Sequence, residues 1–488
     1  MKLNTLLNQV NYELVTGSLN INITNITYDS RKVQKGSLYV CIQGEKLDGH
    51  SFVEEAIKKG AAAILVQKPV KINDKRRTTV IKVDNSRVVL SQISNIFFGS
   101  PSKKMNIVGV TGTNGKTSIS YLISEMLMRI KKNVGVIGTI GIQLNNSDLN
   151  LSKTTPTTPD SLELHMILNE MIKQKATDVV MEVTSIALDQ HRVDDCSINV
   201  GIFTNLTEDH LDYHGDMETY QKAKKKLFDL CKVAVINTDD PTGRYFTDYF
   251  KEKNIEKDAQ LITYGIENDA DITANNIVLK ATGSLFTLDF KGEEYAVKIN
   301  LPGKFNIYNT LAAIGAATYL GVPIENVIET LARIKGARGR FESIETKKGA
   351  SVVIDYAHTP DALENVLKTI VEFNPRKIIT VFGCGGDRDK TKRPIMGGIS
   401  SKYSDLSIIT SDNPRTENPS EIIKDIEKGI NRSNYLIISD REEAIKSAIE
   451  KAGKDDLVLI AGKGHETYQM IDQKTIHFDD MEVVKKYI

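Results

Sequence analysis

The stretch Val108–Ser118, with the sequence VGVTGTNGKTS, decides the fold of the region around it. An apolar strand is predicted over Asn106–Val110, and a helix over Ile119–Ile130, with a turn of Thr, Gly and Asn between them. This order is typical of a phosphate-binding loop, in which backbone N–H groups and a helix N-terminus surround phosphate oxygens. In such a loop Lys116 would neutralise phosphate charge and the Thr117 hydroxyl would bind Mg²⁺.

The loop departs from the general pattern at one place. The usual spacing puts the first glycine at position 110, where this chain has Val110, and Gly109 comes one residue early. Only four residues match in kind: Gly112, Gly115, Lys116 and Thr117. A simple turn followed by a helix start is therefore the alternative that the rest of the chain has to decide.

Composition restricts the class of protein. A chain of 488 residues suggests two to four domains. The 63 basic and 63 acidic residues balance, so we expect no nucleic-acid partner. The four cysteines are scattered without paired spacing, which argues against a zinc site and favours a reducing compartment. No stretch approaches the ~20 apolar residues of a membrane helix, and the N-terminus lacks signal-peptide features, so we expect no membrane insertion and a cytoplasmic location.

Residues 1–100 are predicted to form a small α/β domain. Strands are expected over Thr24–Ser30, Ser37–Ile42 and Ala61–Val66, with a helix over Ser51–Gly60. The polar loops between them are either ordinary solvated loops or a binding module for a polar, anionic small molecule. Composition alone favours solvated loops.

Residues 101–336 alternate strands and helices, which predicts a mostly parallel sheet covered by helices. Further strands are expected over residues 133–138, 178–183, 199–204 and 233–237, and helices over 161–174 and 218–230. Ligands bind beyond the carboxyl ends of such strands, and polar motifs follow three of them. Glu182 follows an apolar run, where an unpaired charge is costly, so it is a candidate Mg²⁺ ligand.

Two other features of this region have ordinary explanations as well. His210 lies in TNLTEDHLDYHG, where a histidine can bind metal or phosphate but is more often a packing or capping residue. Lys222, Lys224, Lys225 and Lys226 form a charge run, and such runs are usually a solvated helix face. The spacing does not distinguish Lys224 from its neighbours.

Residues 337–488 are predicted to form another α/β domain, with strands over 351–356, 377–382, 406–410 and 456–460. Dense polar loops follow these strands, which predicts one ligand-facing rim. Arg388 and Arg415 lie on two of the loops, and two guanidinium groups facing one cleft suit an acidic substrate. The alternative is that both arginines are solvated.

The motifs in their order resemble those of the Mur ligase family, nearly from end to end. They include YDSRKVQKGSLYVCIQG, GVTGTNGKTS, TTPTTPDS, FTNLTEDHLDYHG, GKFNIYNTLAA, DYAHTPDALENVL, FGCGGDRDKTKRP, SDNPRTENP and AGKGHETYQ. The family uses GTNGKT with this spacing, which supports the phosphate-binding interpretation of the loop. The resemblance implies three domains: 1–100 binding the UDP end of a substrate, a P-loop-type ATPase domain over 101–336, and a Rossmann-like amino-acid-binding domain over 337–488.

The resemblance also implies roles for individual residues. Catalytic roles fall on Lys116, Glu182, His210 and Lys224. ATP would be bound by Gly112, Thr113, Asn114, Gly115, Lys116, Thr117, Ser118, Asn306, Arg340 and Asp355. The UDP-linked substrate would be bound by Ser30, Thr157, Thr158, Thr184, Gln190 and Arg192. The amino acid would be bound by Arg388, Asp412, Asn413, Pro414, Arg415, Gly462 and Glu466. Mg²⁺ would lie among Thr117, Glu182, His210 and Lys224, with Lys224 carbamylated (N6-carboxylysine).

The activity implied is ATP-dependent amide formation in peptidoglycan synthesis. The substrates would be the small molecules ATP, a UDP-muramoyl dipeptide and meso-diaminopimelate, and we expect a monomer. The DNPR motif resembles the version that selects diaminopimelate, whose extra carboxylate Arg415 would bind. One departure is Ile186, where the family usually has a histidine. The alternatives are the same ligase using L-lysine, a folylpolyglutamate synthase, and a nucleotide-binding regulator without ligase activity.

Overall fold

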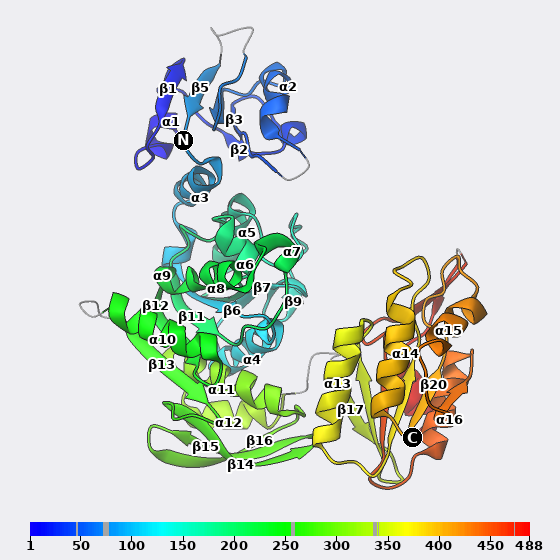
Figure 1. The fold of residues 1–488 in the computed structure, drawn as a ribbon. Coiled ribbons are helices and arrows are strands. Elements are labelled where there is room, and N and C mark those ends of the chain that lie inside the picture. The colour runs from blue at the N-terminus through cyan, green and yellow to red at the C-terminus, as the bar shows by residue number, and fades with distance from the viewer. Residues whose placement is uncertain (45–46, 72–77, 255–258, 335–338, 340, 473) are drawn as a thin grey trace. The chain divides into compact units, whose positions relative to one another are not determined.

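The computed structural model describes residues 1–488 except 45–46, 72–77, 255–258, 335–338, 340 and 473. The chain divides into two compact units, which are described separately (Figure 1). The first contains Met1–Ile272 and Leu311–Val327. The second contains Thr273–Thr310 and Ile328–Ile488.

The first unit begins with a five-stranded sheet of order β1-β5-β4-β3-β2. Its strands are β1 (Glu13–Thr16), β2 (Asn25–Thr27), β3 (Ser37–Val40), β4 (Ala63–Val66) and β5 (Thr79–Lys82). The helices are α1 (Leu3–Leu6), α2 (Val53–Lys58) and α3 (Ser86–Phe97). The predicted strands and helix are present, in shorter form. The sequence analysis did not predict β1 or β5. Strand β1 is antiparallel to β5 and largely exposed, so it lacks a buried apolar run, whereas β5 is mostly buried.

A second sheet of the first unit has β6 (Asn106–Thr111) between two parallel neighbours, β10 (Asp178–Glu182) and β11 (Ile198–Phe203). Within this unit the order is β13-β12-β11-β6-β10-β7-β8-β9. The other strands are β7 (Val134–Gly138), β8 (Gly141–Leu144), β9 (Ser147–Asp148), β12 (Cys231–Asn237) and β13 (Gln260–Gly265). The pairs from β7 to β13 are parallel, as predicted, and β8 and β9 add an antiparallel edge.

Helices accompany this sheet in the alternating order that the sequence predicted. They are α4 (Lys116–Arg129), α5 (Ser161–Lys173), α6 (Ser185–Asp189), α7 (Leu211–His214), α8 (Met217–Lys225), α9 (Leu227–Leu230) and α10 (Pro241–Lys253). The single helix predicted over 218–230 is wrong in one respect, because α8 ends and α9 begins around Lys226.

The second unit contains strands that the sequence analysis did not predict. They are β14 (Ile272–Lys280), β15 (Gly283–Phe290) and β16 (Glu293–Ile299), with β15 and β16 antiparallel in a long hairpin. Exposed and buried residues are mixed along β16, so this strand has no continuous apolar run by which it could be recognised. Helix α11 (Lys304–Tyr319) follows, with residues in both units, and α12 (Ile324–Leu331) comes after it.

The second unit also holds a six-stranded sheet of order β17-β18-β22-β19-β20-β21. Its strands are β17 (Glu342–Glu345), β18 (Ser351–Asp355), β19 (Ile378–Phe382), β20 (Leu406–Ile409), β21 (Tyr435–Ile437) and β22 (Leu457–Ala461), and β23 (Tyr468–Ile471) pairs separately with β24 (Lys474–His477). The helices are α13 (Pro360–Glu372), α14 (Lys392–Tyr403), α15 (Pro419–Glu427), α16 (Arg441–Lys451) and α17 (Asp480–Tyr487).

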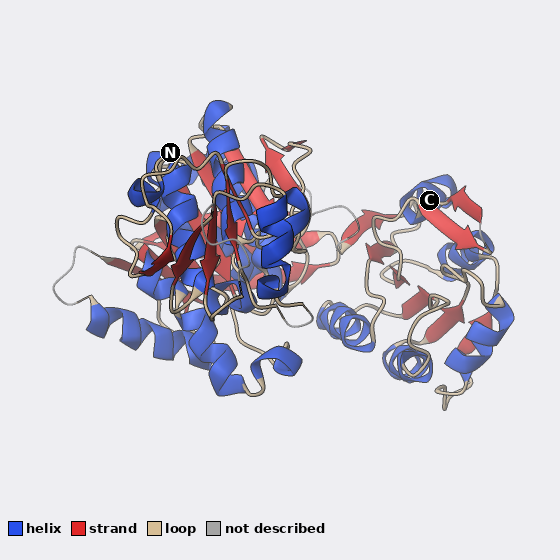
Figure 2. Cartoon of the chain, turned by 90° about the horizontal axis from the view of Figure 1, so that it is seen from above, coloured by secondary structure: helices blue, strands red, loops and turns tan. Residues whose placement is uncertain are grey.

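Helices cover both faces of this six-stranded sheet (Figure 2). Val353 of β18 packs in the core formed with α13, α14 and α15, whereas Val352 and Ile354 pack in the core formed with α16 and α17. Burial on both faces explains why these strands are continuous apolar runs in the sequence. The four strands predicted here are present, and β17 and β21 at the edges were not predicted.

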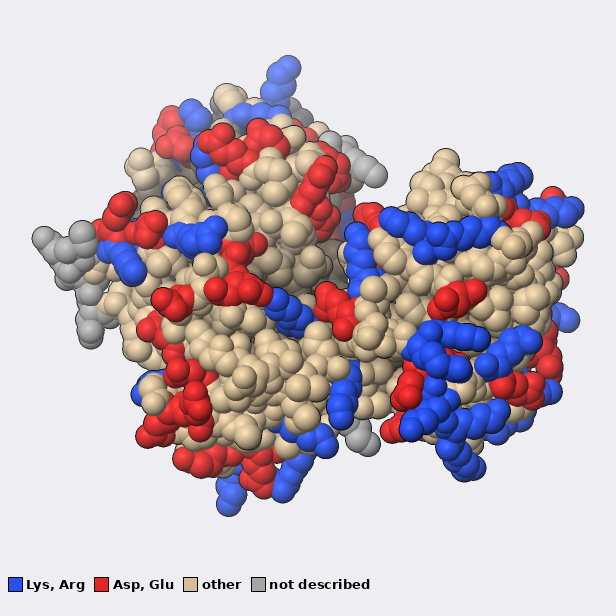
Figure 3. Space-filling view, turned by 60° about the horizontal axis from the view of Figure 1, so that its bottom comes forward, with Lys and Arg blue, Asp and Glu red and all other residues tan. Residues whose placement is uncertain are grey.

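The three larger sheets confirm the predicted α/β class with mostly parallel strands. The domain boundaries at 100/101 and 336/337 stay predictions, and the second falls outside the described residues. On the face drawn in Figure 3, acidic and basic side chains are interspersed, in keeping with their equal numbers. No helix in the described part of the chain is both long and apolar enough to span a bilayer.

Candidate active site

The predicted phosphate-binding loop leaves β6 and enters α4 at Lys116. Gly112 and Gly115 have backbone φ angles of +147° and +90°, which residues other than glycine rarely adopt. A Cβ on Gly112 would lie 1.8 Å from Oγ1 of Thr204, so there is no room for one. The cap residue Gly115 makes no side-chain hydrogen bond to the first turn of α4. The N–H groups of that turn are therefore available to an anion.

Neighbouring loops hold the phosphate-binding loop in shape. The Asn114 N–H donates to Oδ1 of Asn205 at 2.9 Å, and the Thr204 hydroxyl donates to the Asn114 carbonyl at 2.6 Å. The Lys116 ammonium donates to the carbonyl oxygens of Gly112 and Thr113, both at 2.9 Å. Burial lowers the pKa of Lys116, although the nearby Glu182 and Asp209 carboxylates oppose this effect. The lysine thus folds back over the loop in which a phosphate would sit.

Glu182 lies beside this loop because β10 is paired with β6. Its carboxylate is buried, and its Oε1 accepts hydrogen bonds from the Thr117 hydroxyl and the Thr139 N–H, each at 2.9 Å. A Cβ on Gly138 would lie 2.2 Å from the same oxygen. The structure therefore brings Thr117 and Glu182 together, as predicted, at the carboxyl end of the strands.

A chain of hydroxyl groups connects Glu182 to the threonine-rich loop at 154–159. The Thr139 hydroxyl donates to Oε2 of Glu182 at 3.1 Å and lies 3.2 Å from the Thr157 hydroxyl. Lys153 donates to the carbonyl oxygens of Gly138, Pro156 and Thr157, and so ties the loop to the end of β7. The sequence analysis missed Thr139 and Lys153, because neither belongs to a recognisable motif.

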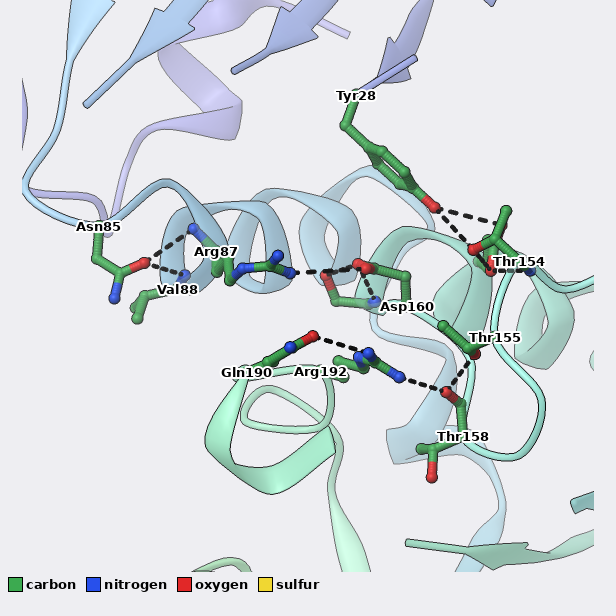
Figure 4. A network of polar contacts seen from close by, with 12 residues as sticks. Tyr28, Asn85, Arg87, Val88, Thr154, Thr155, Thr158, Asp160, Gln190 and Arg192 are labelled. Atoms are coloured by element: carbon green, nitrogen blue, oxygen red, sulfur yellow. Dashed lines mark hydrogen bonds and ion pairs between the residues drawn. The ribbon is translucent and has the colours of Figure 1, made fainter. Parts of the chain in front are cut away.

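The other predicted UDP-substrate residues, except Ser30, also gather around this loop. Figure 4 shows Thr158, Gln190 and Arg192 among them. The Thr158 hydroxyl donates to the Glu182 carbonyl and accepts from the Thr184 N–H. Arg192 donates to the Thr158 carbonyl at 3.0 Å and to Oε1 of Gln190 at 2.7 Å. Four of the six residues therefore form one network, and Thr157 lies next to it.

Residues of the N-terminal sheet region reach the same network. The Tyr28 hydroxyl lies 3.4 Å from the Thr154 hydroxyl and donates to Glu163 at 3.3 Å, and Arg87 of α3 lies 3.9 Å from Asp160 (Figure 4). Ser30 lies elsewhere, in a turn beside α2, where its hydroxyl donates to Glu55. The sequence analysis did not single out Tyr28, although it belongs to the quoted motif YDSRKVQKGSLYVCIQG.

The burial of Lys224 shows that interpreting the whole charge run as a solvated face was wrong. Its side chain is buried, with 1% of the residue exposed, and its ammonium lies 4.4 Å from the centre of the Tyr220 ring. Lys222 and Lys226 instead form exposed ion pairs with Glu218 and Asp189. Burial first, and the charge of Lys116 second, hold the pKa of Lys224 well below its ordinary value.

His210 and Lys224 both lie near the Tyr220 ring, and no contact between His210 and Glu182 is found among the described residues. The His210 ring is 6.3 Å from that of Tyr220 and its Nε2 is 3.6 Å from Asp209. The backbone of His210 has φ of +53°, an uncommon value for a residue other than glycine. The second histidine of the motif, His214, instead hydrogen-bonds the Ser185 hydroxyl and stacks on Tyr220.

The donor set fits Mg²⁺ in part. Among the described residues, no group of three or more His, Cys, Asp or Glu side chains has the arrangement of a metal site. The Thr117 hydroxyl and the Glu182 carboxylate nevertheless supply two adjacent oxygens, which is what Mg²⁺ takes from a protein when phosphate and water complete its shell. Thr117 and Glu182 are therefore the residues that would hold the ion.

The second unit carries the predicted amino-acid residues on the loops after β19, β20 and β22. Arg415 donates to the Gly386 carbonyl at 2.7 Å, so the loops bearing Arg388 and Arg415 are in contact. Asn413 donates to Glu466 at 2.9 Å, and Lys463, which is fully buried, donates to both of them at 3.2 Å. A Cβ on Gly462 would lie 2.8 Å from Asp412. Pro414 is buried between these residues, and Arg388 is exposed.

Three predicted ATP residues also belong to this part of the chain. Asp355 is buried and accepts from the N–H groups of Phe341 and Ala357, both at 2.8 Å. Asn306 is buried in α11, where it donates to the Pro302 carbonyl and accepts from Asn309. Arg340 lies outside the described residues. The ATP-binding roles of these three residues stay predictions.

Family models match the chain in three successive parts. They are the Mur ligase family catalytic domain over residues 22–98, the Mur ligase middle domain over 110–317, and the Mur ligase glutamate ligase domain over 339–464. The middle-domain match includes the loop, Glu182, His210 and Lys224 that are described above.

Relatives and a solved structure match over the whole chain. A protein of Clostridioides difficile named UDP-N-acetylmuramoyl-L-alanyl-D-glutamate–2,6-diaminopimelate ligase is 48% identical, covering 100% of this chain and 99% of its own. Ligase 2 of that name from Clostridium acetobutylicum is 46% identical, covering 100% of both. A solved structure of a ligase with the same name is 33% identical, with a TM-score of 0.79, covering 100% of this chain and 98% of its own. The last match confirms the predicted three-domain fold.

Proposed function

Since this chain belongs to the Mur ligase family, we propose that it joins meso-diaminopimelate to the γ-carboxylate of D-glutamate in UDP-N-acetylmuramoyl-L-alanyl-D-glutamate, using ATP. The observation that carries the proposal is the contact of Thr117 with Glu182 beside a glycine-rich loop, in a chain whose full-length relatives bear that ligase's name. The substrates are small molecules. A cytoplasmic location and a monomeric state belong to the same proposal.

The reaction proceeds in two steps. An oxygen of the D-glutamate γ-carboxylate attacks the γ-phosphorus of ATP, the bond from that phosphorus to the β,γ-bridging oxygen breaks, and an acyl phosphate and ADP form. The neutral amine of diaminopimelate then attacks the acyl carbon, loses a proton, and the tetrahedral intermediate expels inorganic phosphate. Both steps need alignment and charge stabilisation more than covalent help from the protein.

The residues of the first unit supply that stabilisation. Lys116 and the free N–H groups at the start of α4 face the phosphates, where negative charge moves during transfer. Thr117 and Glu182 would hold Mg²⁺, which when bound would neutralise phosphate charge. The hydroxyl chain from Glu182 through Thr139 to Thr157 supports the loop that orients the muramoyl dipeptide next to the ATP site.

Lys224 has the chemistry that carbamylation requires. Only a neutral amine reacts with CO₂, and burial shifts Lys224 toward its neutral form. A carbamate at this position would carry one negative charge near Lys116, and its two oxygens would be suited to hold a second Mg²⁺. His210, on the neighbouring loop, is a further candidate ligand.

The specificity for diaminopimelate is assigned to Arg415. Diaminopimelate carries a second carboxylate at its far end, which lysine lacks, and guanidinium groups bind carboxylates with two parallel hydrogen bonds. One nitrogen of Arg415 is used by the Gly386 carbonyl, which fixes the orientation of the group. Arg388 is the second cation, and Asn413 with Glu466 would receive the amino-acid backbone.

Phosphate release by the purified enzyme tests the proposal. The assay contains ATP, Mg²⁺ and the UDP-muramoyl dipeptide, with diaminopimelate, L-lysine or no amino acid. We expect release that depends on diaminopimelate, with a product heavier by diaminopimelate minus one water. Equal or higher activity with lysine would identify a lysine-adding ligase. Activity only with a folate and glutamate, or none with any acceptor, would overturn the proposal.

A further inference from the structure

Two loops of the second unit, each carrying an arginine assigned to the amino-acid site, are joined at their base by a buried ion pair. Arg393, in the first turn of α14, is fully buried and donates to both carboxylate oxygens of Glu417, at 2.8 and 3.1 Å. It also donates to Asp425 of α15 at 3.0 Å. Helices α14 and α15 lie side by side (Figure 1). The ion pair of Arg393 and Glu417 therefore lies where these two helices meet the loops that precede them.

Glu417 holds the first loop directly as well. Its Oε1 accepts from the N–H of Asp387 at 2.6 Å, one residue before Arg388. Asp387 in turn accepts from the hydroxyl of Thr416, the residue after Arg415, at 2.7 Å. The two loops are thus joined by hydrogen bonds of Thr416 and Glu417 to Asp387. Asp387 is next to Arg388, and Thr416 is next to Arg415.

Both loops contain a strained residue at the point of contact. Asp387 and Arg415 have φ of +54° and +52°, in the left-handed region that residues other than glycine rarely occupy. Such conformations persist where surrounding contacts determine them, and they gather at ligand sites. The N–H of Asp387 is bound by Glu417, and the N–H of Arg415 by the Met470 carbonyl.

The charges favour a permanent pair. Arg393 has no exposed surface, and the Arg393 guanidinium first, with the Asp387 N–H and Lys390 adding to it, lowers the pKa of Glu417 to about 2. Glu417 therefore stays ionised at any pH at which the enzyme would work. Removing one partner leaves the other charged in a buried place, so the pair is sensitive to substitution.

We infer that Glu417 and Arg393 are positioning residues that set the spacing of Arg388 and Arg415, and thereby the preference for an amino acid with a carboxylate on its far end. The inference rests on the proposed function, because it concerns the amino acid of that reaction. Neither residue is assigned a contact with the substrate. They act on the substrate through the two loops, because the positions of the Arg388 and Arg415 guanidinium groups determine which amino acid they bind.

Glu417→Gln tests this inference most sharply. Glutamine has the same shape, keeps an oxygen for the Asp387 N–H, and places an NH₂ group against the donors of Arg393. We expect the KM for diaminopimelate to rise about tenfold or more, as losing a charge-assisted hydrogen bond implies, and the KM values for ATP and the UDP-muramoyl dipeptide to stay within about twofold. The ratio of kcat/KM for diaminopimelate over lysine should fall by a similar factor.

Two further variants separate positioning from simple loss of stability. Thr416→Val removes the hydroxyl hydrogen bond to Asp387, keeps the backbone N–H bond to the same carboxylate and leaves the buried charges in place, so it should shift the same two quantities in the same direction by less. Glu421→Gln is the matched control, because Glu421 lies on α15 in an exposed pair with Lys424. Unchanged diaminopimelate KM and selectivity in both Glu417→Gln and Thr416→Val would overturn the inference, as would an equal rise in all three KM values.

Hydrogen exchange of the substrate-free protein distinguishes failure of this inference from failure of the proposed function. Glu417→Gln should speed amide exchange in residues 383–391 and 411–418 but not in the first unit. Wild type that releases phosphate with lysine alone would overturn the proposed function and, with it, the diaminopimelate preference. Wild type that prefers diaminopimelate, with loops that exchange equally in both proteins, would overturn the inference alone.

Discussion

The Thr117 hydroxyl lies 2.9 Å from Oε1 of Glu182, joining the first turn of α4 to the last residue of β10. These residues are 65 positions apart, and the parallel pairing of β6 with β10 brings them together. The contact places a buried carboxylate beside the loop that would hold the phosphates of ATP. Substitutions at this contact therefore test the proposed reaction most directly.

Glu182→Gln should lower kcat by about 10²-fold or more, because it removes a negative charge from the Mg²⁺ site. Steady-state phosphate release at several Mg²⁺ concentrations measures this, and the half-saturating Mg²⁺ concentration should rise. Asp178→Asn is the control, since Asp178 is a buried carboxylate at the other end of β10, paired with Lys132. That variant should lose stability but keep its Mg²⁺ dependence, and a shift in the Mg²⁺ dependence of both variants would contradict the assignment.

Lys224 should bind CO₂ reversibly. Because its pKa is well below the ordinary value for a lysine, the neutral amine of Lys224 is present at a lower pH than it would be without burial. Protein equilibrated with ¹³C-bicarbonate should show a carbamate carbonyl signal by NMR, and that signal should persist to lower pH than for a surface amine. Lys224→Met should lack the signal and most of the activity. Lys225→Met, whose lysine lies over the Tyr249 ring, should keep both.

Arg415→Met should reduce kcat/KM for diaminopimelate by about 10- to 100-fold, the range expected when a charged hydrogen-bonding partner is lost. Activity with lysine should change little, because lysine has no carboxylate for Arg415 to bind. Kinetics with the two amino acids, at saturating ATP and UDP-muramoyl dipeptide, measure the ratio. Arg432→Met changes an arginine on the same unit that donates to the Ser401 carbonyl and serves as the control. Equal losses with both amino acids would contradict a specificity role.

His165 should make stability depend on pH. It is fully buried on α5, neither ring nitrogen has a partner among the described residues, and burial lowers its pKa to about 4. In the unfolded chain His165 binds a proton near pH 6.5, whereas in the folded chain it does so only near pH 4. The free energy of unfolding should therefore keep its full value above pH 6.5 and fall as the pH decreases from 6.5 toward 4. The loss should amount to at most about 3 kcal/mol.

Thermal unfolding between pH 7.5 and pH 4.5 measures this dependence. His165→Leu removes the titrating group and should flatten the pH dependence of the unfolding temperature. His477→Leu is the control, because that histidine is exposed in a surface pair with Glu482. If His165→Leu and wild type lose stability in parallel on acidification, His165 is not the cause.

Much of the fold could be predicted because local patterns of apolar residues indicate its strands and helices. Apolar runs such as Val179–Met181 and Val352–Ile354 predict strands buried on both faces, and both are strands. Several of the strands that were not predicted are half-exposed, although the buried strand β5 was missed as well. The hairpin of β15 and β16 presents alternating residues without a continuous apolar run, and β1 is mostly exposed.

For the candidate site, the residue types that follow each strand, and the order of motifs behind the family resemblance, could be identified from the sequence. The folded chain was needed to show which lysine of residues 222–226 is buried, and that Lys153, Thr139, Arg393 and Glu417 support the predicted residues. The physical reason is that burial and hydrogen bonding depend on partners far away in the chain. Lys224 differs from Lys225 by the ring and the loop that pack on it, and neither is specified by spacing along one helix.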